Sequence, residues 1–105
     1  MEDEKVIQKY YPNSFKETDL LDYLKSYGLN EVVITGMMTH TCVDSTTRTA
    51  KDIGFDCTII GTACASRDLE NAEKIVKAEY VHDAFLSTLT FFYAKVQNAE
   101  EYLSV

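Results

Sequence analysis

Cys42 is the residue of this sequence best placed for nucleophilic chemistry. It follows an apolar stretch from Val32 to Ile34 and a glycine turn at Gly36, and it begins a segment with helical spacing that ends at Gly54. A thiol in this position lies at the carboxyl end of a strand, where open α/β sheets place their sites. The amino end of a helix also favours a thiolate. The alternative is that Cys42 packs in the core, because free cysteine is among the most buried residue types.

The overall composition is that of a globular domain without a nucleic-acid partner. The chain has 105 residues, of which 46% are hydrophobic and 26% charged, so we expect a single domain. Its net charge of −7 argues against binding to nucleic acid or to anionic membranes. No apolar run approaches the length of about 18 residues that a membrane span needs. We therefore expect no nucleic-acid partner and no membrane partner.

The cysteines and histidines indicate a reducing compartment and give no sign of a metal centre. Three cysteines, an odd number without metal-ligand spacing, fit a cytoplasmic protein better than a disulfide framework. The first residues, Met-Glu-Asp-Glu-Lys, are acidic and unlike a secretory signal. His40 is close to Cys42, but His82 is far along the chain, so no zinc constellation is evident. We expect a cytoplasmic protein without a cofactor, and the sequence leaves its dependence on metal open.

Segments of strand and helix character alternate along the chain. β-branched residues cluster in the expected strands, and apolar residues recur at helical spacing in the expected helices. Strands that alternate with helices imply right-handed βαβ crossovers and a parallel sheet, hence an α/β fold. The expected strands are 5–9, 31–36, 56–60 and 94–96, and the expected helices are 19–27, 42–53, 71–92 with a candidate break near Tyr80, and 99–103.

The segment around Cys42 resembles a known nucleophile motif. From Gly36 to Gly54 the sequence is spaced as Gly-x-x-Thr-x-x-Cys-Val-x-x-Thr-x-Arg-x-Ala-x-x-x-Gly. This pattern is similar to the nucleophile segment of the isochorismatase-like cysteine hydrolases, the superfamily of nicotinamidases and N-carbamoylsarcosine amidase. Residues 6–9, 13–15 and 18–20 resemble the segment that carries the family's catalytic lysine, and residues 62–66 with His82 resemble the following strand end and helix.

The resemblance implies a fold and a place for this chain within the family's domain. We expect a three-layer doubly wound sheet, mostly parallel, with helices on both faces. Residues 1–105 would form a single domain that corresponds to the C-terminal portion of the full family domain. The family's first strand, which carries a catalytic aspartate, lies well upstream of the position of Lys9. A sheet shortened there would expose an edge and an apolar face, so we expect a homo-oligomer, a dimer or higher.

The same resemblance assigns roles to individual residues. It implies that Cys42 is the catalytic nucleophile and that Lys9 supplies a positive charge that favours its thiolate. The backbone amides of Met38 and Cys42 would form the oxyanion hole, with a cis peptide between Met37 and Met38. The family's general base is the upstream aspartate, and no acid of this sequence takes its place. Histidine is a common general base and His40 lies two residues before Cys42, although an exposed turn histidine is the commoner case.

Three further residues, Tyr10, Thr39 and His40, are candidates for the lining of a substrate pocket. The hydroxyl of Thr39 is also expected to brace the turn before Cys42 rather than to react. Structural explanations suffice for the remaining residues with reactive or charged side chains: an ion pair for Arg48, core packing for Cys57 and Cys64, and a link between helices for His82.

Two functions are compatible with these residues. The first is a hydrolase that cleaves a C–N bond of a small amide through Cys42 and Lys9. The thiol favours an amide or carbamoyl substrate over isochorismate, because vinyl-ether cleavage in the family does not need it. The second is a non-catalytic truncated homologue or fragment that serves only as a structural or oligomerising domain. Without the aspartate, we expect the chain alone to be weakly active or inactive.

Overall fold

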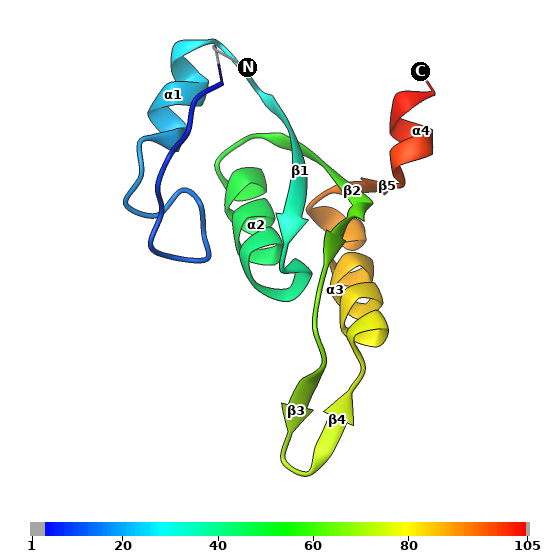
Figure 1. Ribbon diagram of the computed structural model, residues 1–105. Coiled ribbons are helices and arrows are strands. Elements are labelled where there is room, and N and C mark those ends of the chain that lie inside the picture. Colours follow the sequence, from blue (N-terminus) through cyan, green and yellow to red (C-terminus); the bar gives the residue numbers. More distant parts are fainter. Residues whose placement is uncertain (1–3, 105) are drawn as a thin grey trace.

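The computed structural model describes residues 4–104, which form a parallel sheet with flanking helices and a separate hairpin (Figure 1). A π-helical turn, η1 (Thr39–Val43), connects the first strand to the second helix. The strands are β1 (Glu31–Met37), β2 (Asp56–Ala65), β3 (Leu69–Asn71), β4 (Lys74–Val76) and β5 (Lys95–Gln97), and the helices are α1 (Leu20–Ser26), α2 (Asp44–Asp52), α3 (Ala78–Phe92) and α4 (Ala99–Leu103). None of these helices, within residues 4–104, is long and apolar enough to cross a lipid bilayer.

The main sheet has the strand order β1-β2-β5, and both pairings are parallel. β1 pairs with β2 in one register up to Ile34 and Ile59, and after a shift the pairing resumes between Gly36 and Cys64. β2 extends to Ala65 and is longer than the expected strand over 56–60. The predicted α/β class with a parallel sheet is confirmed.

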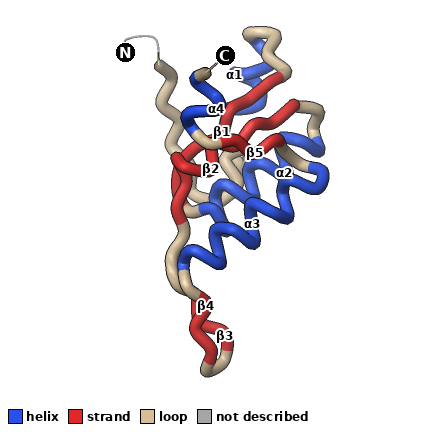
Figure 2. Tube along the Cα trace, turned by 90° about the vertical axis from the view of Figure 1, so that its right-hand side faces the viewer, coloured by secondary structure: helices blue, strands red, loops and turns tan. Residues whose placement is uncertain are grey.

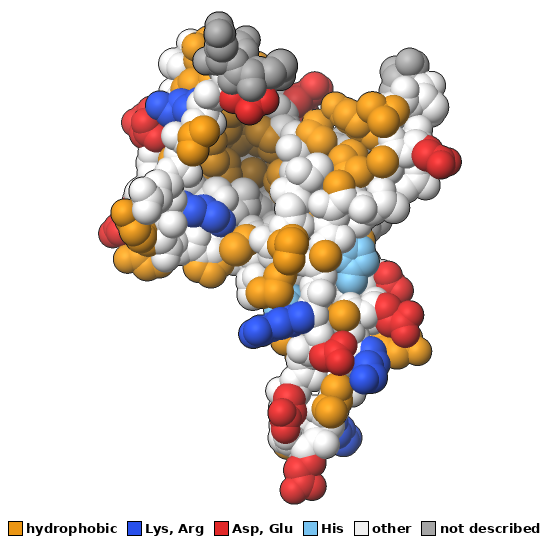
Figure 3. Space-filling view, viewed as in Figure 1, with side chains coloured by type: hydrophobic (Ala, Val, Ile, Leu, Met, Phe, Trp, Pro, Cys, Tyr) orange, Lys and Arg blue, Asp and Glu red, His pale blue; other side chains and the backbone are white. Residues whose placement is uncertain are grey.

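The core lies between this sheet and the helices α2 and α3, which share one face of it (Figure 2). Side chains alternate along a strand, so Val32 and Ile34 of β1 pack towards the core, whereas Val33 and Met37 are 47% and 69% exposed. Figure 3 views the molecule from the side away from α2 and α3, and hydrophobic side chains lie there in a hollow of the surface. The buried residues of the core are Val43, Ile59 and Leu89 in one cluster and Ala50, Phe55 and Cys57 in another.

Helix α4 lies against the other face of the sheet. A Cβ atom at Gly61 would point at Leu86 of α3, so the next residue of β2, Thr62, points the opposite way. The hydroxyl of Thr62 accepts a hydrogen bond from the backbone N–H of Ala99 at 2.9 Å, where α4 begins. The described residues thus place helices on both faces of the sheet, as predicted.

The predicted strand over residues 5–9 is wrong. The segment from residue 4 to Asp19 contains no helix or strand and lies beside α1 (Figure 1). Lys5 forms an ion pair with Asp19 at 3.2 Å, which holds the segment near the start of α1. Within residues 4–104 no strand pairs with residues 5–9, and β-branched character alone does not make a strand without such a partner.

The predicted helix over 71–92 begins later than expected, at Ala78. Residues 69–76 instead form the antiparallel hairpin β3–β4, which extends away from the rest of the molecule (Figure 1). Ala72 turns the chain with a φ of 56°. Asp68 then accepts a hydrogen bond from the N–H of Ala78 at 2.8 Å, at the first residue of α3. The other expected elements correspond to α1, β1, η1 with α2, β2, β5 and α4.

Candidate active site

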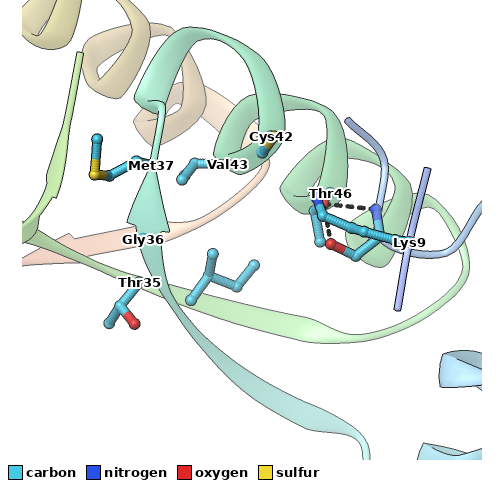
Figure 4. A pocket seen from close by; sticks show the side chains of 9 residues that line it. Lys9, Thr35, Gly36, Met37, Cys42, Val43 and Thr46 are labelled. Carbon is cyan, nitrogen blue, oxygen red and sulfur yellow. Dashed lines mark hydrogen bonds between the residues drawn. The ribbon is translucent and has the colours of Figure 1, made fainter. Parts of the chain in front are cut away.

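Cys42 and Lys9 line one cavity, although they are far apart in the sequence (Figure 4). The cavity has a volume of about 210 Å³ and lies where β1 gives way to η1. Both side chains are half-buried. The residues that line it are Lys9, Ser14, Ile34, Thr35, Gly36, Met37, Cys42, Val43 and Thr46.

A sharp turn after β1 brings Cys42 to this cavity. Gly36 has a φ of +130°, a conformation that residues with side chains rarely adopt, and the peptide bond between Met37 and Met38 is cis, as the sequence resemblance implies. The carbonyl of Met38 accepts hydrogen bonds from the N–H groups of Thr41 at 3.1 Å and Val43 at 3.2 Å. These bonds close the turn so that Cys42 lies in the first coil of the helical segment.

The turn is also fixed to α3. Thr39 is fully buried, and its hydroxyl lies 2.7 Å from Nδ1 of His82. A buried hydroxyl needs such a partner, because an unpaired one costs about 1–3 kcal/mol. Thr39 therefore holds the turn and His82 connects it to a helix, as the sequence led us to expect.

Lys9 reaches the cavity from a segment without regular secondary structure. Its Nζ donates a hydrogen bond to the carbonyl of Pro12 at 2.8 Å. In Figure 4 the Lys9 side chain extends from its own segment towards the helix that carries Thr46. The hydroxyl of Thr46 in turn accepts a hydrogen bond from the N–H of Ser14 at 2.9 Å. The lysine-bearing segment is thus attached directly to α2.

The predicted pocket residues lie elsewhere. Tyr10 is 78% exposed, and His40 directs its Nδ1 to the hydroxyl of Ser66 at 3.2 Å, with its ring 5.9 Å from that of Phe85. Neither of them, nor Thr39, is among the described residues that line the cavity with Cys42. Their part in substrate binding stays a prediction.

Thr46 is the site residue that sequence reasoning missed. It is part of the motif around Cys42, but no role was assigned to it. It lies one helical turn after the cysteine, and residues four apart share a helix face, so its spacing is the signal that could have placed it in the same cavity.

The other thiols have a different environment from Cys42. Burial raises the pKa of Cys57, which packs in the core, and burial also raises the pKa of Cys64, with a hydrogen bond from the Gly36 backbone acting in the opposite direction. The raised pKa values favour the protonated, less nucleophilic form of both thiols. Across residues 4–104, no group of three or more His, Cys, Asp or Glu side chains is arranged to hold a metal ion.

Arg48 has the structural role that the sequence suggested. Its Nε lies 3.0 Å from a carboxylate oxygen of Asp44, one turn earlier on α2, and its guanidinium lies 4.8 Å from the centre of the Tyr93 ring. The two contacts join α2 to the end of α3 and leave the side chain outside the cavity lining.

Comparisons with known proteins identify the family of this chain. The family model of the isochorismatase domain matches residues 1–101. The isochorismatase family protein YddQ of Bacillus subtilis is 45% identical over 103 residues, which cover 98% of this chain and 57% of that protein. The chain spans about half the length of the curated relatives it matches.

Solved structures show the same similarity in three dimensions. An isochorismatase-family protein from Oleispira antarctica has 43% identity and a TM-score of 0.96, with 100% of this chain and 56% of that chain covered. A nicotinamidase from Bacillus subtilis has 28% identity and a TM-score of 0.70, with 86% of this chain and 45% of that chain covered.

Proposed function

The chain belongs to the isochorismatase family, and on that premise we propose that it carries the nucleophile of a hydrolase that cleaves the C–N bond of a small amide. One observation carries the proposal: Cys42 and Lys9 line the same cavity. A thiol at the start of a helix, in a cavity that an ammonium-bearing side chain also lines, is in surroundings that favour a nucleophilic thiolate.

The reaction follows from these groups. The sulfur of Cys42 attacks the carbonyl carbon of the amide, and the electron pair of the C=O bond moves to the oxygen. Backbone N–H groups of Met38 and Cys42 stabilise that oxyanion. When the carbonyl re-forms, the C–N bond breaks, the nitrogen takes a proton and leaves as ammonia or an amine, and the acyl group remains on sulfur as a thioester. Water then cleaves the thioester to release the acid and the thiol.

The size of the cavity supports a small substrate. Its volume of about 210 Å³ is below the roughly 300–1,000 Å³ of drug-sized ligand pockets. A nicotinamidase is among the related structures, and its name denotes an enzyme that acts on the amide of nicotinamide. We take nicotinamide and other small primary amides as the first candidate substrates.

The general base is not among the residues that line the cavity. Those of its lining residues that the structure describes include no Asp or Glu. We therefore assign proton transfer to the aspartate that the family resemblance implies, and to none of these lining residues. The chain alone should consequently turn over amides slowly, while its thiol should still react with electrophiles that need no base.

Two measurements test this function. Ammonia release from nicotinamide should depend on Cys42, so that Cys42→Ala abolishes whatever turnover the chain shows. Nicotinaldehyde, which adds a thiol to its carbonyl without loss of a leaving group, should protect Cys42 from iodoacetamide, with the alkylation of Cys64 as the internal control. Turnover that survives Cys42→Ala, or an aldehyde that gives Cys42 no protection, would contradict the proposal.

We also propose that the single domain of residues 1–105 associates with copies of itself, as a dimer or higher oligomer. The support is the exposure of apolar side chains: Met37, Phe91 and Phe92 are 69%, 92% and 60% exposed. Light scattering across a range of protein concentrations tests this association, and a mass equal to one chain at every concentration would exclude it.

A further inference from the structure

We propose that Thr46 is a positioning residue whose hydroxyl holds the acceptor of the Lys9 ammonium group and so fixes that group in the cavity that Cys42 also lines. The inference deepens the proposed function and rests on it, because it matters only if Lys9 activates Cys42. It concerns a residue of α2 that lies one helical turn after the cysteine.

The carbonyl oxygen of Pro12 joins the two side chains. It accepts a hydrogen bond from Nζ of Lys9 at 2.8 Å, and the hydroxyl of Thr46 lies 3.3 Å from the same oxygen in donor geometry. A backbone carbonyl has two lone pairs, so it can accept both bonds at once. Thr46 thereby contacts the group that orients the ammonium, without contacting the ammonium itself.

Thr46 also holds the backbone next to this carbonyl. Its hydroxyl accepts a hydrogen bond from the N–H of Ser14 at 2.9 Å and lies 3.1 Å from the Ser14 hydroxyl; the dashed lines in Figure 4 mark these bonds. A hydroxyl has one proton, so it donates either to Pro12 or to the Ser14 hydroxyl while it accepts from the Ser14 amide. All of these contacts lie within the short segment that follows Lys9.

A second threonine of α2 holds the same segment at a different point. The hydroxyl of Thr49 accepts a hydrogen bond from Nδ2 of Asn13 at 2.9 Å, and the Asn13 side chain accepts one from the N–H of Phe15 at 3.0 Å. Thr46 and Thr49 are three residues apart and so share a helix face. Of these two threonines, Thr46 contacts the Pro12 carbonyl that accepts the hydrogen bond from Lys9, and Thr49 contacts Asn13 instead. Thr49 is therefore a matched control.

Lys9 needs a held acceptor because its own segment has no regular secondary structure to place it. Residues 4–19 form no strand or helix, so sheet hydrogen bonds do not place its backbone. Its side chain has several rotatable bonds, and ordering it costs up to about 2 kcal/mol of conformational entropy. An acceptor that is itself held by a side chain of α2 reduces the range of positions that the ammonium can sample.

The test is the rate at which iodoacetamide alkylates Cys42 in the full chain at neutral pH, resolved by site with mass spectrometry. Thr46→Val should slow the reaction by about threefold or more, the scale of coupling within one hydrogen-bond network. Thr46→Ser, which keeps the hydroxyl, should retain the rate, and Thr49→Val should slow it less than Thr46→Val. Thr46→Ala removes the same hydroxyl and replaces the valine variant if circular dichroism shows that the latter is unfolded.

A second set of variants separates this inference from the proposed function. Lys9→Met should slow the alkylation of Cys42, and Thr46→Val added to Lys9→Met should slow it no further. If Lys9→Met leaves the rate unchanged, the proposed function fails at its nucleophile. If Lys9→Met slows the reaction but Thr46→Val does not, or if Thr46→Val acts equally with and without Lys9, the positioning role of Thr46 is overturned. A loss with Thr49→Val as large as that with Thr46→Val would likewise overturn it.

Discussion

The hydroxyl of Thr39 and Nδ1 of His82 lie 2.7 Å apart and join the turn that carries Cys42 to helix α3. Thr39 is fully buried and His82 is half-buried. Among the described side-chain hydrogen bonds this contact links the turn to α3, while the hydrogen bond from Ser14 to Thr46 attaches the lysine-bearing segment to the helix that follows the turn. The position of the nucleophile therefore depends on contacts with both neighbours.

Thr39→Val should lower the free energy of unfolding by about 1–3 kcal/mol, because it removes one partner of a buried hydrogen bond. His82→Ala should also destabilise the fold. The double variant should lose less than the sum of the two single losses, since each single change already breaks the same bond. Urea unfolding of the four proteins measures this coupling, and strictly additive losses would show that the contact contributes nothing to stability.

Thr47→Val should stabilise the protein. Thr47 is fully buried in α2, and its hydroxyl has no hydrogen-bond partner within the part of the chain that the structure describes. Valine has nearly the same shape without the polar group, so the free energy of unfolding should rise by about 1 kcal/mol. Thr49→Val is the matched control on the same helix, because its hydroxyl accepts a hydrogen bond from Asn13 and its loss should destabilise. A change of the same sign in both variants would contradict this explanation.

Cys57 should make the protein less stable in alkali. Burial raises the pKa of its thiol above the ordinary value, so the folded state keeps its proton at a pH where the unfolded chain has begun to lose it. The contribution is complete below the unfolded pKa of about 8.5 and is lost as the pH rises through the folded pKa. Cys57→Ala should therefore lose less stability than the parent between about pH 7.5 and pH 9.5. Urea unfolding at both pH values measures the loss in the free energy of unfolding for each protein. An equal loss in the parent and in Cys57→Ala would contradict the prediction.

The local sequence pattern was sufficient to predict those elements whose secondary-structure preference and buried face agree. The apolar run of β1, the glycine at its end and the helical spacing after Cys42 predicted the strand, the turn and α2. These three elements depend on contacts between residues that are close in sequence, or on the regular spacing of apolar residues that one buried face requires. The resemblance to a known nucleophile motif then added the pairing of Cys42 with Lys9, which spacing alone could not give.

The errors occur where partners outside the segment decide the structure. Glu70, Glu73 and Lys74 are acceptable helix residues, but the chain there pairs with itself as β3 and β4 around Ala72, and no Asn-Gly or Asp-Gly turn signals the hairpin. The hydrogen bond from the Thr46 hydroxyl to the Pro12 carbonyl could not be predicted from the sequence either, because it joins a helix to a segment without regular structure. No periodicity predicts such a contact.

The most direct test of the site is whether Lys9 controls the reactivity of Cys42. In the parent chain at neutral pH, iodoacetamide should alkylate Cys42 faster than Cys57 or Cys64, because burial raises the pKa of those two thiols. Lys9→Met should slow Cys42 selectively, whereas Lys25→Met, a change of the same charge on the exposed side of α1, should leave its rate unchanged. This pattern is expected if Lys9 and Cys42 form one nucleophilic site. An alkylation rate of Cys42 that is equal in the parent, Lys9→Met and Lys25→Met proteins would contradict it.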